Sequence, residues 1–190
     1  MSTLIDNAFS EHAAVANQTL TTLRDSIARA AGLISSALKQ DGMLLLCGNG
    51  GSASDCQHIS AELVGRYKKD RRPLRAVSLH TDTSSLTCIA NDFGYEDIFS
   101  RQVEALGRKG DVLLAISTSG NSENVRRAML KAKENGITVI ALLGKGGGPC
   151  AALADLAMIV PSSTTARIQE MHIMIGHLLC EMVEHDLGLD

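Results

Sequence analysis

The chain has 190 residues, of which 45 % are hydrophobic, and a formal net charge of -3 at pH 7. This length fits one domain whose core is large enough to be stable without disulfides or metals. The chain has no Trp and no strong excess of basic residues, which disfavours nucleic acid as the main ligand. No apolar run reaches membrane-spanning length. We therefore expect neither nucleic acid nor a membrane as a partner.

The first element is predicted to be one long helix over about residues 4–39, which Asp41-Gly42 ends. Its apolar residues recur at helical spacing, namely Val15, Leu20, Leu23, Ile27, Ala30, Ala31, Ile34 and Leu38. We treat residues 1–40 as a helical segment that packs on the domain or on an oligomer, and residues 41–190 as the ligand-binding part of a single domain.

After the first helix the pattern changes to short apolar runs separated by helical stretches. The runs cover residues 43–47, 76–79, 112–116, 138–143 and 156–160. Each is too short for a helix and ends at small or polar residues, as is typical of parallel strands buried between two layers of helices. The alternation predicts an α/β fold with an open parallel five-stranded sheet, closed by a terminal helix over about residues 166–187.

Two of these strands lead into loops of small polar residues, Gly48-Asn49-Gly50-Gly51-Ser52 and Ser117-Thr118-Ser119-Gly120-Asn121-Ser122. Open α/β sheets bind ligands at the carboxyl ends of their strands, where both loops lie. The hydroxyls of the serine loop (residues 117–122) can donate to phosphate oxygens, and the helix that follows directs free N–H groups at an anion. An ordinary helix N-cap uses the same residue types, so the loop alone leaves both interpretations open.

The glycine loop also satisfies the Gly-x-Gly-x-x-Ala spacing of a dinucleotide-binding loop, which Ala53 completes. The acidic residue expected about 20 positions later at a strand end is missing. A nicotinamide-dependent enzyme is therefore only a minor alternative.

Potential ligand and acid/base residues lie on two of the predicted helices. His58 and Glu62 are four residues apart and share a helix face, where they form either a metal or acid/base pair or a surface ion pair. The terminal helix adds Gln169, Glu170, His172 and His177 among apolar residues. A single His on such a face is more often a core residue, and only convergence of several groups would indicate a site.

The five cysteines are odd in number and form no Cys-x-x-Cys, which disfavours a disulfide scaffold or a zinc knuckle and favours a reducing cytosol. The N-terminus has no secretory signal pattern. The basic run of Lys68, Lys69, Arg71 and Arg72 is predicted to be a solvated loop.

Taken in order, these motifs resemble the phosphoheptose isomerases of the sugar isomerase (SIS) domain family nearly end to end. The resemblance implies a SIS-type sandwich, with residues 41–190 as the sugar-phosphate-binding domain. It also implies a cytoplasmic homotetramer with one Zn²⁺ per subunit, which converts sedoheptulose 7-phosphate to glycero-manno-heptose 7-phosphate for bacterial lipopolysaccharide. The matching segments are residues 47–52, His58-x-x-x-Glu62-Leu63, Gly65-Arg66-Tyr67, residues 91–94, 110–114 and 116–122, Arg167-Ile168-Gln169-Glu170 and His177.

The resemblance also assigns roles to individual residues. It makes Glu62 and His177 the catalytic acid/base pair. It implies that the metal ligands are His58, Glu62, Gln169 and His177. It implies that the residues in contact with the substrate are Asn49, Gly50, Gly51, Glu62, Asn91, Asp92, Ser117, Thr118, Ser119, Ser122 and Gln169. Ala166 is a departure, because some members carry Asp there, and Glu62 would have to combine metal binding with basicity.

Three questions stay open at this point. A non-catalytic relative that associates with the replication initiator shares the fold, but such proteins lack the residues that correspond to Glu62 and His177. An isomerase for another sugar phosphate would show the same motifs. The metal ligands belong either to one chain or to two, and we expect sharing with a neighbouring subunit.

Overall fold

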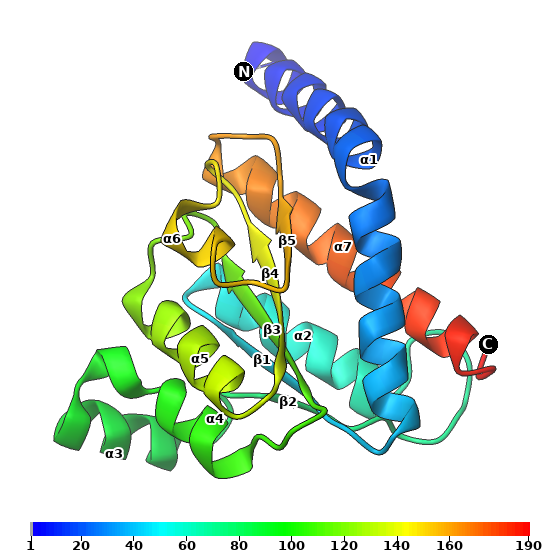
Figure 1. The fold of residues 1–190 in the computed structure, drawn as a ribbon. Helices are drawn as coiled ribbons and strands as arrows, with labels where there is room; N and C mark the ends of the chain where they lie inside the picture. Colours follow the sequence, from blue (N-terminus) through cyan, green and yellow to red (C-terminus); the bar gives the residue numbers. More distant parts are fainter. Residues whose placement is uncertain (1) are drawn as a thin grey trace.

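The computed structural model describes residues 2–190 and consists of a parallel sheet between two layers of helices (Figure 1). The strands are β1 (Leu44–Gly48), β2 (Ala76–Ser78), β3 (Val112–Ser117), β4 (Thr138–Leu143) and β5 (Leu156–Ile159). The helices are α1 (Ser2–Lys39), α2 (Gly51–Val64), α3 (Thr83–Phe93), α4 (Ser100–Leu106), α5 (Glu123–Glu134), α6 (Gly148–Ala151) and α7 (Thr165–Asp186), with a 3-10 turn, η1 (Tyr95–Asp97), after α3. The predicted α/β class and all five strands are confirmed, with strand boundaries that differ by one residue at most.

The strand order is β2-β1-β3-β4-β5, and every pairing is parallel. Helices α1, α2 and α7 cover one face of the sheet, and α4 and α5 cover the other. Alternate residues of β3 serve the two faces, so Leu114 packs under α1 and α7 while Leu113 packs under α5. This double burial explains why the strands appear in the sequence as continuous apolar runs.

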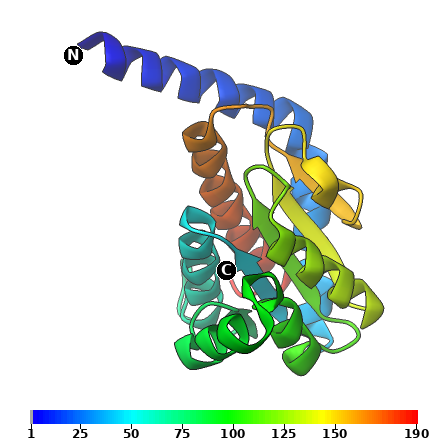
Figure 2. The same cartoon turned by 90° about the vertical axis from the view of Figure 1, so that its left-hand side faces the viewer.

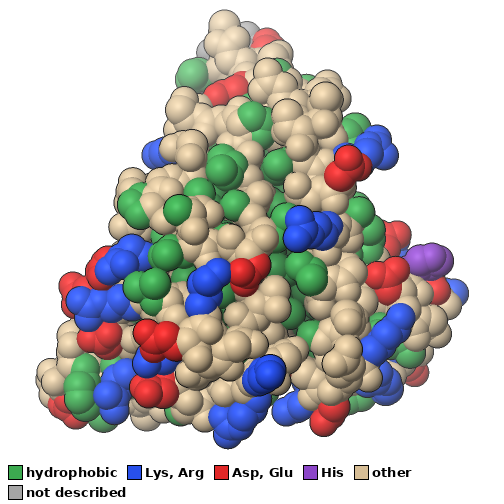
Figure 3. All heavy atoms as spheres, viewed as in Figure 1, with side chains coloured by type: hydrophobic (Ala, Val, Ile, Leu, Met, Phe, Trp, Pro, Cys, Tyr) green, Lys and Arg blue, Asp and Glu red, His purple; other side chains and the backbone are tan. Residues whose placement is uncertain are grey.

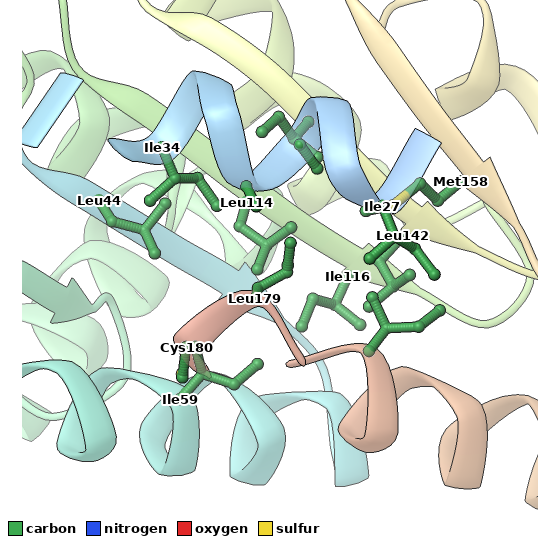
Figure 4. Close-up of a cluster of buried hydrophobic side chains, with 14 of the residues drawn as sticks. Ile27, Ile34, Leu44, Ile59, Leu114, Ile116, Leu142, Met158, Leu179 and Cys180 are labelled. Atoms are coloured by element: carbon green, nitrogen blue, oxygen red, sulfur yellow. The ribbon is translucent and has the colours of Figure 1, made fainter. Parts of the chain in front are cut away.

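The larger core cluster holds α2 and α7 against the sheet (Figure 4). Ile34 of α1, Ile59 of α2 and Leu179 of α7 are all almost fully buried there beside Leu44 and Leu114. Full burial of such a side chain contributes about 1.5–3 kcal/mol relative to leaving it in water. The two helices that carry His58 and His177 are therefore fixed relative to each other by apolar packing.

The first half of α1 projects beyond the body of the molecule, as Figure 2 shows. Its apolar side chains Leu4, Ile5 and Phe9 are exposed, Phe9 to 73 %. Leu20 belongs to the periodic apolar positions but is also exposed, because it lies on the outer face of the helix while Val15, Thr19 and Leu23 are buried. Apolar surface of this kind on a projecting helix is typical of a contact with another copy or partner.

The basic run after α2 differs from the predicted solvated loop at one position. Lys68 and Arg72 are exposed, but the Arg71 side chain retains only 2 % of its exposure because it pairs with Glu184 of α7. Elsewhere, on the face seen in Figure 3, acidic and basic side chains are interspersed along the lower half. Among the described residues, no helix is both long and apolar enough to cross a membrane.

Candidate active site

The sheet register brings the two polar loops together at its carboxyl edge. Gly48 at the end of β1 pairs with Ile116, the residue before the serine loop. The side-chain amides of Asn49 and Asn124 exchange hydrogen bonds of 2.8 and 2.9 Å, which join the glycine loop to the start of α5. The Tyr95 hydroxyl also donates to Oδ1 of Asn49, at 3.0 Å. The predicted position of both loops at the carboxyl ends of their strands is therefore confirmed, and the two loops are neighbours.

The serine loop turns back on itself through its own hydroxyls. Ser117 Oγ accepts a hydrogen bond from the Gly120 N–H at 3.1 Å and lies 3.2 Å from Ser122 Oγ. Gly120 has φ +66°, and a β-carbon there would overlap the Gly147 carbonyl, so only glycine fits. Ser122 occupies the N-cap position of α5, but its side chain makes no capping hydrogen bond. This favours a ligand-binding loop over the ordinary N-cap interpretation.

His80 supports the glycine loop from the end of β2, a role that no pattern in the sequence indicated. One ring nitrogen, Nε2, lies 2.6 Å from the Gly48 carbonyl oxygen, and the other, Nδ1, lies 2.7 Å from Ser78 Oγ. The ring also meets the edge of Phe99, with centroids 4.9 Å apart. Burial lowers the pKa of His80, so the ring is held neutral and donates to the loop.

A second group of polar side chains lies where α2 and α7 run side by side. His58 Nε2 lies 3.1 Å from Glu62 Oε1 and 3.2 Å from His177 Nε2. The three donor atoms all lie within 4.8 Å of one another and could hold a metal ion. The helices approach this closely because Gly176 faces Ile59, where any β-carbon would collide.

All three groups belong to one chain and come together without a neighbouring subunit, so sharing between subunits is not needed to assemble these three; the expected sharing of ligands stays a prediction. Their convergence favours a metal or acid/base site over a simple surface ion pair between His58 and Glu62.

Asp55 lies one turn before His58 on α2 and was missed by the sequence interpretation. Its Oδ2 atom is buried without a hydrogen-bond partner among the described residues. Burial raises the pKa of this carboxyl, while His58 and His177 act in the opposite direction. An unpaired carboxylate oxygen beside two imidazoles adds negative potential to the cluster, as a cation site requires.

Other predicted site residues lie elsewhere in the fold. Gln169 sits near the start of α7, where its amide fills the space beside Gly51 of α2. It is eight residues before His177, which is about 12 Å along the helix axis. Glu170 bonds His12 Nδ1 at 2.7 Å and ties α7 to α1. His172 is fully buried against the Leu143 carbonyl, which makes it a core residue.

Asn91 and Asp92 are exposed at the end of α3, where the Asn91 amide donates to the Asp92 carboxylate at 2.7 Å. Within residues 2–190, a connection to the site runs through the next turn, where the Tyr95 hydroxyl bonds Asn49. Thr118 and Ser119 belong to the serine loop, and Ser119 Oγ accepts from the Asn121 N–H at 3.2 Å.

Comparisons with known proteins find a matching family and similar proteins. Residues 9–144 match the SIS domain family. A phosphoheptose isomerase of Helicobacter pylori is 52 % identical over 181 residues, which cover 95 % of this chain and 94 % of the relative. One of a Nitratiruptor species is 55 % identical over 180 residues, covering 95 % and 96 %.

Solved structures give the same result. A phosphoheptose isomerase from Neisseria gonorrhoeae superposes with a TM-score of 0.92 at 44 % identity, covering 97 % of this chain and 98 % of the other. One from Francisella tularensis has a TM-score of 0.94 at 37 % identity, covering 97 % and 100 %.

Proposed function

The chain belongs to the phosphoheptose isomerases of the SIS domain family, and we propose that it interconverts sedoheptulose 7-phosphate and glycero-manno-heptose 7-phosphate at the site described above. The observation that carries the mechanism is the convergence of His58, Glu62 and His177 on one point. Such a product serves as a precursor of bacterial lipopolysaccharide. The replication-initiator-associating alternative is disfavoured because the acid/base pair is present.

The serine loop supplies the phosphate end of the site. Ser117, Ser119 and Ser122 place hydroxyls around a loop whose backbone is tightened by Gly120, and α5 begins directly after it. Free N–H groups and the positive end of the helix dipole favour an anion at such a position. Asn49, Gly50 and Gly51 of the adjacent loop contact the sugar, together with Thr118 and Gln169.

The donor set of the cluster fits zinc. Two ligands at the usual Zn–N distance of about 2.0–2.1 Å, seen from the metal at a tetrahedral angle, lie about 3.3 Å apart. The separations from His58 Nε2 to Glu62 Oε1 and to His177 Nε2 are 3.1 and 3.2 Å, close to that value. We propose that these residues hold one Zn²⁺ per subunit, with Gln169 as a fourth ligand that would have to move from its place against Gly51.

The isomerisation moves one proton between carbons and one between oxygens. Glu62 takes a proton from C1 of the ketose, which leaves an enediol across C1 and C2, and returns a proton to C2. His177 carries a proton from the C1 oxygen to the C2 oxygen, so that C1 ends as the aldehyde. Zinc, when bound, stabilises the negative charge that develops on the enediol oxygens.

The arrangement of Glu62 supports a way for it to bind metal and act as a base. Only Oε1 of Glu62 faces His58, and Oε2 makes no hydrogen bond within residues 2–190. The second oxygen is therefore available to accept a proton while the first one binds.

A homotetramer would cover this site. The His58 and Glu62 side chains are 48 % and 25 % exposed, so water can reach the site in the single chain. An enediol intermediate has to be shielded from water. Met174 and Leu178 of α7 leave apolar surface beside His177, and α1 projects further apolar side chains. A neighbouring copy on these surfaces would close the site. All five cysteines are free thiols, which supports a reducing cytoplasm.

Product identification by NMR tests the function. The purified protein with Zn²⁺ is incubated with ketose phosphates of five, six and seven carbons. We expect the aldose 7-phosphate to form from sedoheptulose 7-phosphate, and little product from the shorter sugars. Turnover of a five- or six-carbon sugar in preference would reassign the substrate.

A further inference from the structure

The chain buries one ion pair almost completely, just beyond the proposed metal ligands. Arg71 and Glu184 retain 2 % and 1 % of their side-chain exposure, with Arg71 Nε 2.8 Å from Glu184 Oε1. Arg71 lies in the loop of residues 65–72 that follows α2, and Glu184 lies on α7, seven residues after His177. Burying two charges is costly, so such a pair persists only where further hydrogen bonds satisfy both groups.

The Arg71 guanidinium is satisfied by main-chain carbonyls at the end of α2. Nη2 donates to the Glu62 carbonyl at 2.8 Å, so it holds the backbone of a proposed catalytic residue in place. Nη1 donates to the carbonyls of Leu63, Gly65 and Arg72, at 2.8, 3.0 and 3.1 Å. The pair therefore ties the end of α2 and the loop after it to α7.

The Glu184 carboxylate holds the same loop from the other side. It accepts from the backbone N–H of Tyr67 at 3.0 Å and from that of Lys68 at 3.4 Å. The loop fixed in this way lays the Tyr67 ring on the His177 ring, with centroids 5.7 Å apart and planes inclined by 25°. His58 meets the same imidazole edge-on, with centroids 5.0 Å apart.

Apart from its contacts with His58 and the Tyr67 ring, the His177 imidazole makes no hydrogen bond within residues 2–190 that would fix its plane. A metal-binding His usually donates its second ring N–H to a carboxylate or carbonyl, which fixes the plane of the ring. His177 uses Nε2 toward His58, and its Nδ1 makes no hydrogen bond within residues 2–190. A stacked aromatic ring restricts the same rotation by packing.

We propose that Tyr67, held in place by the Arg71–Glu184 pair, is a positioning residue that fixes the His177 imidazole toward His58 and Glu62. This inference rests on the proposed role of His177. It depends on the ring of Tyr67 and not on its hydroxyl, which has no hydrogen bond within the described residues.

The experiment compares four variants of the full-length, zinc-loaded protein. Tyr67→Phe keeps the ring, Tyr67→Leu removes it but keeps an apolar side chain, and His177→Gln is the reference for loss of the site. Lys69→Ala is the matched control, because this exposed residue lies in the same loop and its side chain makes no hydrogen bond or ion pair within residues 2–190. The measurements are kcat and KM, zinc retention on dialysis, and the visible spectrum of the Co²⁺-substituted protein.

A small misplacement of a catalytic group can cost about 100-fold in rate, so we expect Tyr67→Leu to lower kcat about 10- to 100-fold. KM should change less than about threefold, because the proposed phosphate contacts belong to the serine loop and not to the loop that carries Tyr67. The Co²⁺ spectrum of Tyr67→Leu should change, and Tyr67→Phe and Lys69→Ala should behave like the unmodified protein.

Unchanged kcat and an unchanged Co²⁺ spectrum in Tyr67→Leu would overturn the inference, and so would an equal loss in Tyr67→Phe. If Tyr67→Leu fails to fold, Tyr67→Met gives the same comparison with a more adaptable side chain. An active His177→Gln variant would instead refute the proposed role of His177, so the two failures are distinguishable.

Discussion

His172 makes the stability of this protein depend on pH in a predictable direction. The imidazole is fully buried, its Nε2 donates to the Leu143 carbonyl at 3.1 Å, and its Nδ1 has no partner among the described residues. Protonation would place an unpaired charge and an unpaired N–H in the core. Burial accordingly lowers the pKa of His172 to about 4.

Because the pKa of His172 is lower in the folded state than in the unfolded state, folding disfavours protonation of this residue. Between the usual His pKa of about 6.5 and the folded value, the unfolded chain binds a proton that the folded chain does not. The free energy of unfolding therefore falls as the pH decreases, by about 1.4 kcal/mol per pH unit. Over the whole window this amounts to about 3 kcal/mol, which is present in full above pH 6.5 and absent below pH 4.

The substitution His172→Gln isolates this contribution, because the Gln amide can still donate to Leu143 but does not titrate in this range. Urea unfolding of both proteins is measured from pH 7.5 to pH 4.5 at one protein concentration. The difference between the two free energies of unfolding then excludes the contributions of assembly and of the titrating groups that both proteins share. We expect the stability difference to move in favour of the variant by about 1.4 kcal/mol per pH unit below pH 6.5. A difference that stays constant with pH would refute the reasoning.

Three further predictions concern the loops and the surface. The double substitution Ser119→Ala with Ser122→Ala should raise KM for the sugar phosphate at least about tenfold, since each hydrogen bond to a charged group contributes about 1.5–3 kcal/mol. Binding of the dephosphorylated sugar, measured by calorimetry, should stay nearly unchanged. Gly120→Ala should lower the thermal midpoint more than Gly110→Ala, because both have positive φ but only residue 120 meets backbone atoms, and equal shifts would contradict the proposed clash. Met174→Glu should dissociate the oligomer and reduce zinc retention and activity together in sedimentation and metal analysis, and an active, zinc-loaded monomer would exclude the assembly argument.

The sequence was sufficient to predict the layers of the fold. Strands such as Val112–Ser117 are buried on both faces, so their apolar runs identify them without any tertiary information. The position of the glycine and serine loops at one edge also followed, because parallel strands end there, but their contact depends on β1 and β3 being neighbours in the sheet. Met174 suits the assembly test better than its neighbour Ile173, since Ile173 packs partly against the core of its own chain.

The parts that could not be predicted depend on which helix faces meet. The spacing of His58 and Glu62 fixes their shared face, but the approach of His177 depends on Gly176 packing against Ile59. The burial of Arg71 likewise depends on Glu184, which is 113 residues away in the sequence. Without knowledge of that partner, the basic run has the pattern of a solvated loop.

The central claim is that Glu62 moves the proton in an enediol isomerisation, and solvent exchange measures this step. Zinc-loaded protein is incubated with sedoheptulose 7-phosphate in D₂O, and deuterium at C1 of the ketose and at C2 of the aldose is followed by NMR. We predict incorporation at both positions by the unmodified protein, and a loss of about 100-fold or more in Glu62→Gln, in keeping with the removal of a general base. Exchange by Glu62→Gln at the rate of the unmodified protein would contradict the account.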